Sequence, residues 1–149
     1  MRIVRAVARL LISTLFIGSG IDVLRHPDMR AEVATDTLGR LRKRFPAIPE
    51  DDATIVRANA AVQVGAAALM ARGRMPRASA GVLAASLVPT TIAGHRFWTI
   101  DEPEARAQQQ VHFTKNLAVL GGLLMAMTAP SPRRTKRRKS RPPRGAERS

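Results

Sequence analysis

The chain has 149 residues and carries 25 Lys and Arg against 11 Asp and Glu, a formal net charge of +14 at pH 7. It contains no cysteine, which excludes disulfide frameworks, thiol catalysis and cysteine-held zinc or iron–sulfur centres. The length corresponds to one domain, and the mean hydropathy of −0.10 conceals a very uneven distribution of charge.

Four windows of 12 to 17 residues contain no Asp, Glu, Lys or Arg; they are 10–21, 58–71, 78–94 and 116–132. A surface helix of a soluble bundle turns a polar face to water about every 3.6 residues, and these windows provide no such face. With flanking residues, each approaches the roughly 20 residues that cross a bilayer. We therefore predict an all-α fold, a four-helix transmembrane bundle, and keep a soluble helical bundle as the alternative. The predicted helices cover about 6–24, 53–72, 77–96 and 113–129.

The first of these helices shares features with a signal peptide, because Arg2 and Arg5 precede its apolar stretch. However, residues 18–22 form a poor cleavage site, and three further apolar segments follow. We interpret it as a retained membrane helix.

Residues 28–45, in the loop after the first helix, have an amphipathic helical pattern. Acidic residues occupy the first turn, and apolar residues recur every three to five positions beside the basic run 40–44. Such a helix lies either on the outer leaflet or in solvent, and the pattern fits both. The acidic residues 50–52 then supply anionic capping for the next helix.

Small residues at four-residue spacing are typical of closely packed membrane helices. Here they predict close contacts between the helices, and a homodimer stays open as an alternative. The pairs are Ala61/Gly65, Ala80/Ala84, Gly81/Ala85 and Ala118/Gly122. In the first helix, Gly18 and Gly20 have no side chain and permit close approach of a neighbour.

Residues 131–149 form a basic tail with nine Lys and Arg, one acid and three prolines. This composition cannot bury a core and predicts disorder. We favour a role as an electrostatic clamp on anionic lipid headgroups over nucleic-acid binding, because aromatic residues and a folded basic module are missing.

The distribution of basic residues predicts the topology. With the N-terminus inside, 15 Lys and Arg lie on the inner side and 10 on the outer side. The positive-inside rule then favours both termini in the cytoplasm.

In this topology ten polar or aromatic residues fall toward the outer helix ends, and such convergence at one end of a bundle is what a small-molecule pocket requires. They are Asp22, Arg57, Asn59, Gln63, His95, Arg96, Trp98, His112, Lys115 and Asn116.

Each of these residues also has a structural interpretation. Asn59 and Gln63 suit hydrogen bonds between helices, Trp98 suits the membrane interface, and Asp22 suits an ion pair with Arg57, Arg96 or Lys115. Pro89 frees a backbone carbonyl in the third helix, and Thr90 and Thr91 are close enough to cover it.

His95 and His112 admit three interpretations: ligation of haem or a metal, contact with a quinone carbonyl, or a structural role. Neither has a carboxylate at a metal-ligand spacing, which disfavours haem and predicts no metal site. The sequence has no nucleophile elbow, phosphate loop or zincin motif, so we predict no catalytic residue.

Several strings together resemble the DoxX family of small four-helix membrane proteins. They are FIGSGID at 16–22, NAAVQVG at 59–65, PTTIAGHRFW at 89–98, HFTKNLA at 112–118 and GGLL at 121–124. The resemblance covers about 5–128 and indicates one membrane domain at 1–130, followed by the tail.

Membership of this family implies an inner-membrane bundle linked to redox physiology, as a quinone-reductase subunit or as a membrane partner of oxidative-stress enzymes. Our leading hypothesis is a non-catalytic scaffold, or a subunit beside a quinone, whose partner subunits carry the redox chemistry. The rivals are a membrane oxidoreductase subunit that binds quinone or haem at the outer polar cluster, and a small-solute transporter.

Overall fold

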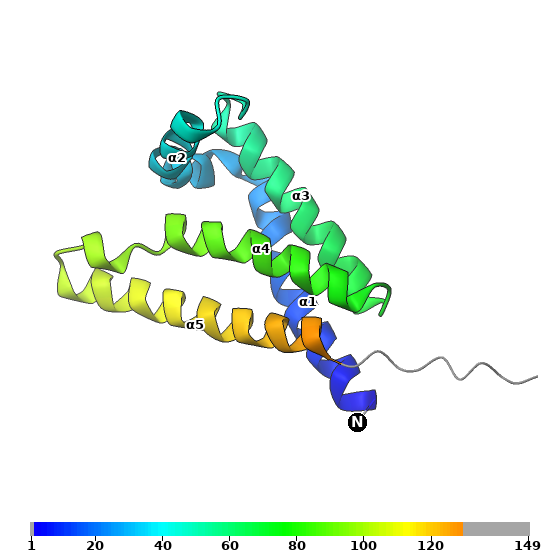
Figure 1. The fold of residues 1–149 in the computed structure, drawn as a ribbon. Helices are drawn as coiled ribbons and strands as arrows, with labels where there is room; N and C mark the ends of the chain where they lie inside the picture. The colour runs from blue at the N-terminus through cyan, green and yellow to red at the C-terminus, as the bar shows by residue number, and fades with distance from the viewer. Residues whose placement is uncertain (1, 130–149) are drawn as a thin grey trace, which may run out of the picture.

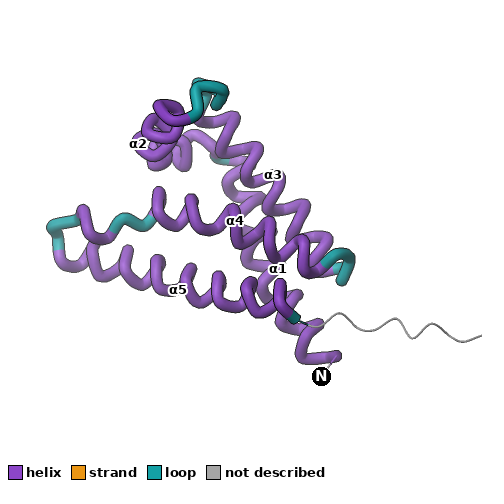
Figure 2. Tube along the Cα trace, viewed as in Figure 1, coloured by secondary structure: helices purple, strands orange, loops and turns teal. Residues whose placement is uncertain are grey.

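The computed structural model describes residues 2–129, and these form helices and no strands (Figures 1 and 2). The predicted all-α class is therefore confirmed, while the predicted tail, 131–149, lies outside the described residues. The elements are α1 (Arg2–Arg25), α2 (Pro27–Arg44), α3 (Asp52–Ala71), α4 (Pro76–Gly94), η1 (Phe97–Thr99) and α5 (Pro103–Thr128).

Local sequence signals mark where the helices begin. Helices α2, α4 and α5 each start with a proline, which suits the first turn because the N–H is not needed there. Asp51 caps α3 by accepting a hydrogen bond from the backbone N–H of Ala53 (3.1 Å). Glu102 caps α5 by accepting one from the backbone N–H of Ala105 (2.6 Å).

The last helix is longer than its charge-free window. We predicted a start near residue 113, whereas α5 begins at Pro103. The Glu102 cap and the proline after it provide the start signal, and the Ala- and Gln-containing segment 105–110 continues the helix because both residues have high helix propensity. This segment carries charge and amide groups, so a search for uncharged windows could not include it.

The helices associate mainly as two antiparallel pairs, α1 with α3 and α4 with α5, joined by contacts of α3 with α4 (Figure 1). The compact four-helix bundle is not confirmed, because the pairs diverge away from the turn between α3 and α4. The buried core lies where the pairs cross. It consists of Phe16, Ala66, Ala67, Met70, Ala80, Leu83, Ala84, Leu87 and Leu123.

Close contact between α1 and α3 depends on Gly20. A Cβ atom at this position would lie 2.6 Å from Val64 Cγ2 and 3.4 Å from the carbonyl oxygen of Ala60. By contrast, the predicted pair Ala61/Gly65 is exposed. Helix α1 packs on the adjacent face of α3, which carries the buried Ala60, because that face also bears the core residues of α3.

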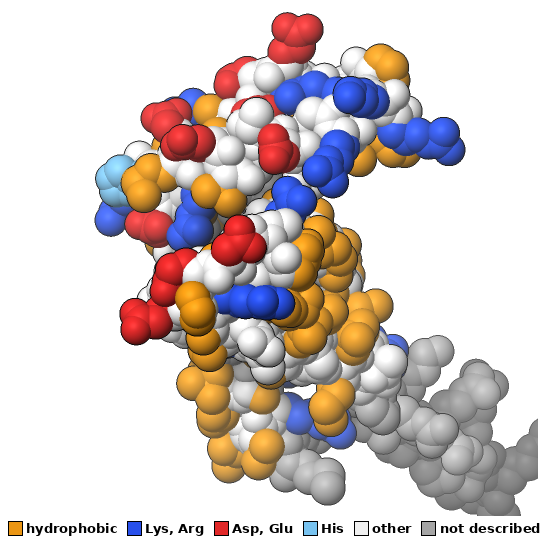
Figure 3. Space-filling model, turned by 90° about the vertical axis from the view of Figure 1, so that its left-hand side faces the viewer, with side chains coloured by type: hydrophobic (Ala, Val, Ile, Leu, Met, Phe, Trp, Pro, Cys, Tyr) orange, Lys and Arg blue, Asp and Glu red, His pale blue; other side chains and the backbone are white. Residues whose placement is uncertain are grey.

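Two described helices are long and apolar enough to cross a membrane, α1 over Ile3–Arg25 and α3 over Asp52–Ala71. Only 17% and 28% of their apolar windows are buried, and side chains such as Leu11 are 69% exposed. On one face of the molecule, charged side chains gather mostly over the upper part and apolar ones below (Figure 3). That α4 and α5 also cross the membrane stays a prediction. Proline, serine and threonine lower the hydropathy of α4, and the first half of α5 is polar.

Helix α2 packs across α3 and α4, so it does not lie free of the other helices. Pro27 and Ala31 are its buried residues. Its polar side attaches to Asp52 at the start of α3, which accepts hydrogen bonds from Thr35 Oγ1 (2.9 Å) and from the guanidinium of Arg42. These contacts place α2 over the end of the molecule where the two helix pairs diverge.

Candidate functional site

A cavity of about 640 Å³ lies between the diverging helix pairs, and all five α-helices line it. We call it the five-helix pocket. Its wall is mostly apolar and includes Phe16, Val33, Leu38 and Leu87. The polar residues on its wall are Ser19, Arg30, Thr37, Asn59, Gln63, Thr90, His95, Gln109, His112, Lys115 and Asn116.

Six of the ten candidate residues line the five-helix pocket: Asn59, Gln63, His95, His112, Lys115 and Asn116. They come from α3, from the end of α4 and from the first half of α5. The other four, Asp22, Arg57, Arg96 and Trp98, are not part of its lining.

A hydrogen-bonded network joins α3 to α4 at the base of this pocket. Gln63 Nε2 donates to Ser86 Oγ (2.7 Å), and Ser86 Oγ donates to Asn59 Oδ1 (2.5 Å). Gln63 and Ser86 are buried. The predicted hydrogen bonds between helices are therefore present, and they hold both amides in fixed orientations.

A second polar contact joins α4 to α5 beyond Pro89. Asn116 Nδ2 donates to the buried Thr91 Oγ1 (3.0 Å), and Thr90 Oγ1 donates to the carbonyl of Ser86 (3.0 Å). Of the two threonines that are available to cover the carbonyl freed by Pro89, Thr90 bonds to the neighbouring carbonyl of Ser86, and Thr91 serves the contact with α5. As a result the polar side chains of α3, α4 and α5 surround one volume.

The two histidines lie side by side in the pocket wall. The rings of His95 and His112 stack with centroids 5.3 Å apart and planes 18° from parallel. His95 Nδ1 lies 2.7 Å from Gln109 Oε1, an oxygen that only accepts, so Nδ1 is the donor of this hydrogen bond. Lys115 Nζ lies 3.4 Å from His112 Nδ1, so a cation stands next to the imidazole pair.

This arrangement does not suit haem or a metal. Two ligands of one metal ion must point ring nitrogens at it, whereas the stacked rings turn their faces to each other. No group of three or more His, Asp or Glu residues that could hold a metal ion occurs in the described range 2–129.

The predicted ion pair of Asp22 with a basic residue of another helix is wrong. Its side chain is 63% exposed, and the partner within reach is His26 Nδ1 (3.8 Å). Arg96 pairs instead with Asp36 of α2 (3.8 Å). The reason is the position of α2, which presents its own carboxylate to the end of α4.

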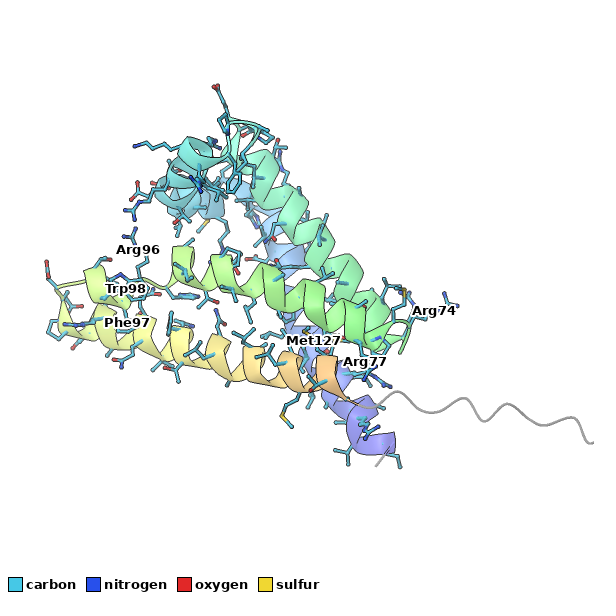
Figure 4. All side chains as sticks on the ribbon, in the orientation of Figure 1. Arg74, Arg77, Arg96, Phe97, Trp98 and Met127 are labelled. Atoms are coloured by element: carbon cyan, nitrogen blue, oxygen red, sulfur yellow. The ribbon has the colours of Figure 1, made fainter. Side chains whose placement is uncertain are left out.

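Trp98 belongs to an aromatic cluster outside the pocket. Its ring meets Phe97 and Phe113 edge to face, with centroids 5.2 and 5.9 Å away. Figure 4 shows Arg96, Phe97 and Trp98 together beside the start of α5. Trp98 is 48% exposed, which suits a residue at a membrane interface. Arg57 is exposed as well.

Sequence reasoning missed Gln109 and Ser86, which hydrogen-bond directly to predicted site residues. The predicted helices, 77–96 and 113–129, leave Gln109 between them and therefore outside the predicted cluster. A helical signal was present, because Gln109, His112 and Asn116 recur at three- and four-residue spacing and therefore share one helix face. Ser86 is a single small polar residue in an apolar helix, and no comparable pattern marks it.

The family model that matches this chain is DoxX, over residues 4–96. The match spans more than half of the chain and includes α1 to α4. The chain belongs to the DoxX family. This DoxX chain is accordingly a membrane protein, which agrees with its two membrane-length helices. The comparisons with curated proteins and with solved structures found no match.

The DoxX match ends at Arg96, before α5 begins. The family-wide pattern therefore covers the α3 and α4 side of the pocket, with Asn59, Gln63 and His95. The α5 side, with His112 and Asn116, is contributed by residues beyond the matched span.

Proposed function

We propose that this DoxX protein is a multi-pass inner-membrane subunit that binds a quinone in the five-helix pocket. In this proposal both termini lie in the cytoplasm, and redox enzyme subunits carry out the chemistry. The protein itself has no catalytic residues and serves as the quinone-adjacent scaffold. The observation that carries the proposal is the composition of the pocket, a mostly apolar cavity into which amide, imidazole and ammonium groups converge.

The pocket suits a quinone by size and by chemistry. Its volume of about 640 Å³ falls within the roughly 300 to 1,000 Å³ typical of small-molecule sites. A quinone has a planar ring, carbonyl oxygens that only accept hydrogen bonds, and an apolar tail. Lys115 and Arg30 line the cavity and no carboxylate does so within the described residues, which favours oxygen acceptors over cations.

Particular side chains are available to hold the carbonyl oxygens. Asn59 Oδ1 is occupied by Ser86, so its Nδ2 group can donate to a ligand. Lys115 supplies a further donor next to His112. When bound, a quinone supplies two-electron, two-proton redox capacity. The stacked imidazoles of His95 and His112 stand in the same wall as further hydrogen-bonding groups for the quinone.

The orientation is supported by where the chain segments meet. The start of α1, the turn between α3 and α4, and the end of α5 lie at the same end of the molecule (Figure 1). Arg5, Arg9 and residues 72–77 bring positive charge to that end, which favours the cytoplasmic side. The five-helix pocket is then on the periplasmic side.

The test is binding of a short-tailed quinone to the full chain in lipid nanodiscs. Trp98 is the only tryptophan and touches Phe113, next to His112, so decylubiquinone in the pocket should quench its fluorescence. We expect Asn59→Ala and His112→Ala each to weaken binding about tenfold, the loss of about 1.4 kcal/mol.

His26→Ala is the matched control, because His26 is exposed and lies outside the pocket lining. Membrane abundance of every variant is measured in parallel. Unchanged quinone binding in both pocket variants contradicts the proposal. A fall in abundance that accounts for the whole loss of binding would assign these residues to packing instead.

The scaffold part of the proposal is tested by affinity purification from mildly solubilised membranes. We expect a redox enzyme to co-purify in stoichiometric amount with a chain that has no haem absorption. A haem band on the isolated chain, with no co-purifying enzyme, contradicts this part.

A further inference from the structure

Three segments of the chain meet at the end opposite the five-helix pocket. Arg9 of α1 reaches the turn between α3 and α4, where its Nη2 lies 3.6 Å from the position that a Cβ on Gly73 would occupy. Arg77 Nε donates to the carbonyl oxygen of Ala129, just after α5 (2.8 Å). Figure 4 shows Arg74 and Arg77 at this end of the molecule, near Met127.

Five arginines gather in these segments: Arg5, Arg9, Arg72, Arg74 and Arg77. We call them the turn arginines. The described segments that build this end contain no carboxylate, since Asp and Glu are absent from 2–21, from 53–100 and from 105–129. The positive charge of the turn arginines is therefore not neutralised by side chains of these segments.

Arg9 differs from the exposed members of this group. Its side chain is partly buried, and its Nε is fully buried with no hydrogen-bond partner among residues 2–129. A buried guanidinium donor without a partner is costly. The Nη2 group of the same guanidinium lies at the exposed Gly73 of the turn, where an anion from outside the protein would stabilise its charge.

The start of α4 adds a second attraction for an anion. Helix α4 begins beside Arg77 with no side-chain cap and no acidic residue in its first turn. Its free N–H groups carry the positive end of the helix dipole, which favours negative charge. The turn has left-handed backbone at Gly73 (φ 66°) and Met75 (φ 50°), and Arg9 lies against Gly73, shortly before α4 begins at Pro76.

The depth of the corner in the membrane identifies the anion. Helix α3 is long and apolar enough to cross a membrane and ends at Ala71, directly before the turn. The guanidinium of Arg9 reaches from α1 to this turn, so the corner stands at the level of the lipid headgroups. We propose that the turn arginines bind the phosphate of an anionic phospholipid, with Arg9 as the buried anchor and Arg72, Arg74 and Arg77 around it. This site is separate from the predicted clamp in the tail.

The test is lipid retention by the full chain, measured by native mass spectrometry from detergent. Phosphatidylglycerol, cardiolipin and phosphatidylcholine are added at equal phosphate concentration, and inorganic phosphate is added in a further sample. We expect retention of the two anionic lipids over phosphatidylcholine, with little effect of inorganic phosphate. Arg9→Gln and Arg74→Gln should each weaken anionic-lipid binding about fivefold.

Two variants of the full chain separate this site from other basic residues. Arg57→Gln removes an exposed arginine from the opposite end of α3 and should leave lipid retention unchanged. Replacement of all nine Lys and Arg in 133–148 by Gln removes the basic charge of the tail, and the effect of Arg9→Gln should persist in that background.

Three results would overturn the proposal. One is equal retention of phosphatidylcholine, and another is complete loss of anionic-lipid retention in the tail variant alone. The third is retention of inorganic phosphate equal to that of the anionic lipids. That result would assign the site to the free ion. Because the readout does not involve quinone, it is independent of the five-helix pocket.

Discussion

The missing methyl group of Gly20 lets α1 approach α3 closely. In Gly20→Ala the new Cβ would lie 2.6 Å from Val64 Cγ2 and 3.4 Å from the Ala60 carbonyl oxygen, so either the Val64 side chain or the two helices must shift. We expect a loss of about 1 to 3 kcal/mol of stability, measured by denaturation of the purified protein. Gly18→Ala is the matched control, because nothing lies within 4 Å of its Cβ position. Equal stability of both variants would contradict this packing.

The carboxylate of Asp51 makes the stability of the start of α3 depend on pH. The hydroxyl of Thr54 donates a hydrogen bond to its carboxylate (2.5 Å), and this bond is the main reason that the pKa of Asp51 is lowered from its usual value. A lowered pKa in the folded state means that the ionised form stabilises the fold. That contribution is fully present above the unfolded pKa of about 3.9 and is lost as the pH falls through the folded value.

We therefore expect Asp51→Ala to lower the midpoint of thermal unfolding by a few degrees at pH 7. The difference in unfolding midpoint between this variant and the unmodified chain should disappear as the pH falls from about 5 to about 2. A series of unfolding curves across this range checks it. A gap of constant size at every pH would show that the carboxylate charge makes no contribution.

At the scale of elements, Arg42 fixes α2 and its loop to α3. Its guanidinium donates to the carbonyls of Pro49 and Glu50 (2.9 Å each) and to the carboxylate of Asp52. We expect Arg42→Ala to destabilise the protein by about 1 to 3 kcal/mol, because several acceptors lose their charged donor. Hydrogen exchange should then rise through α2.

Two comparisons make this prediction specific to the geometry of Arg42. Arg44→Ala removes the same charge from an exposed position of α2 and should leave exchange unchanged. Arg42→Lys keeps the charge but loses the planar fork, so most of the effect should remain. Full rescue by lysine would indicate that charge alone holds α2.

At the scale of the whole molecule, the absence of cysteine allows the orientation to be tested with single substitutions. Ala47→Cys lies in the exposed loop after α2, and Ser149→Cys lies at the C-terminus. In right-side-out vesicles, a membrane-impermeant maleimide should label the first and should reach the second only after the vesicles are opened. The reverse pattern would place the five-helix pocket on the cytoplasmic side.

Part of the pocket lining was predictable from the sequence. Helix ends on the same side of a membrane lie close together, irrespective of which helix faces pack against each other. That rule is enough to place Asn59, His95 and Asn116 near one another. It could not predict the partner of Arg96, because Asp36 reaches it through α2, an element outside the predicted bundle. Nor could it predict Gln109, since the α5 segment that carries it is too polar to look like part of a membrane helix.

The sequence by itself determined the helical class, the family and six of the polar residues that line the five-helix pocket. These follow from charge-free windows and local strings, which record interactions within one segment and with lipid. Only the tertiary structure decided which faces meet, that the two helix pairs diverge, and that α2 covers the space between them. The physical reason is that apolar helices in lipid carry weak sequence signals for their partners. Their association depends on close shape fit, as at Gly20, and on single hydrogen bonds, as at Ser86.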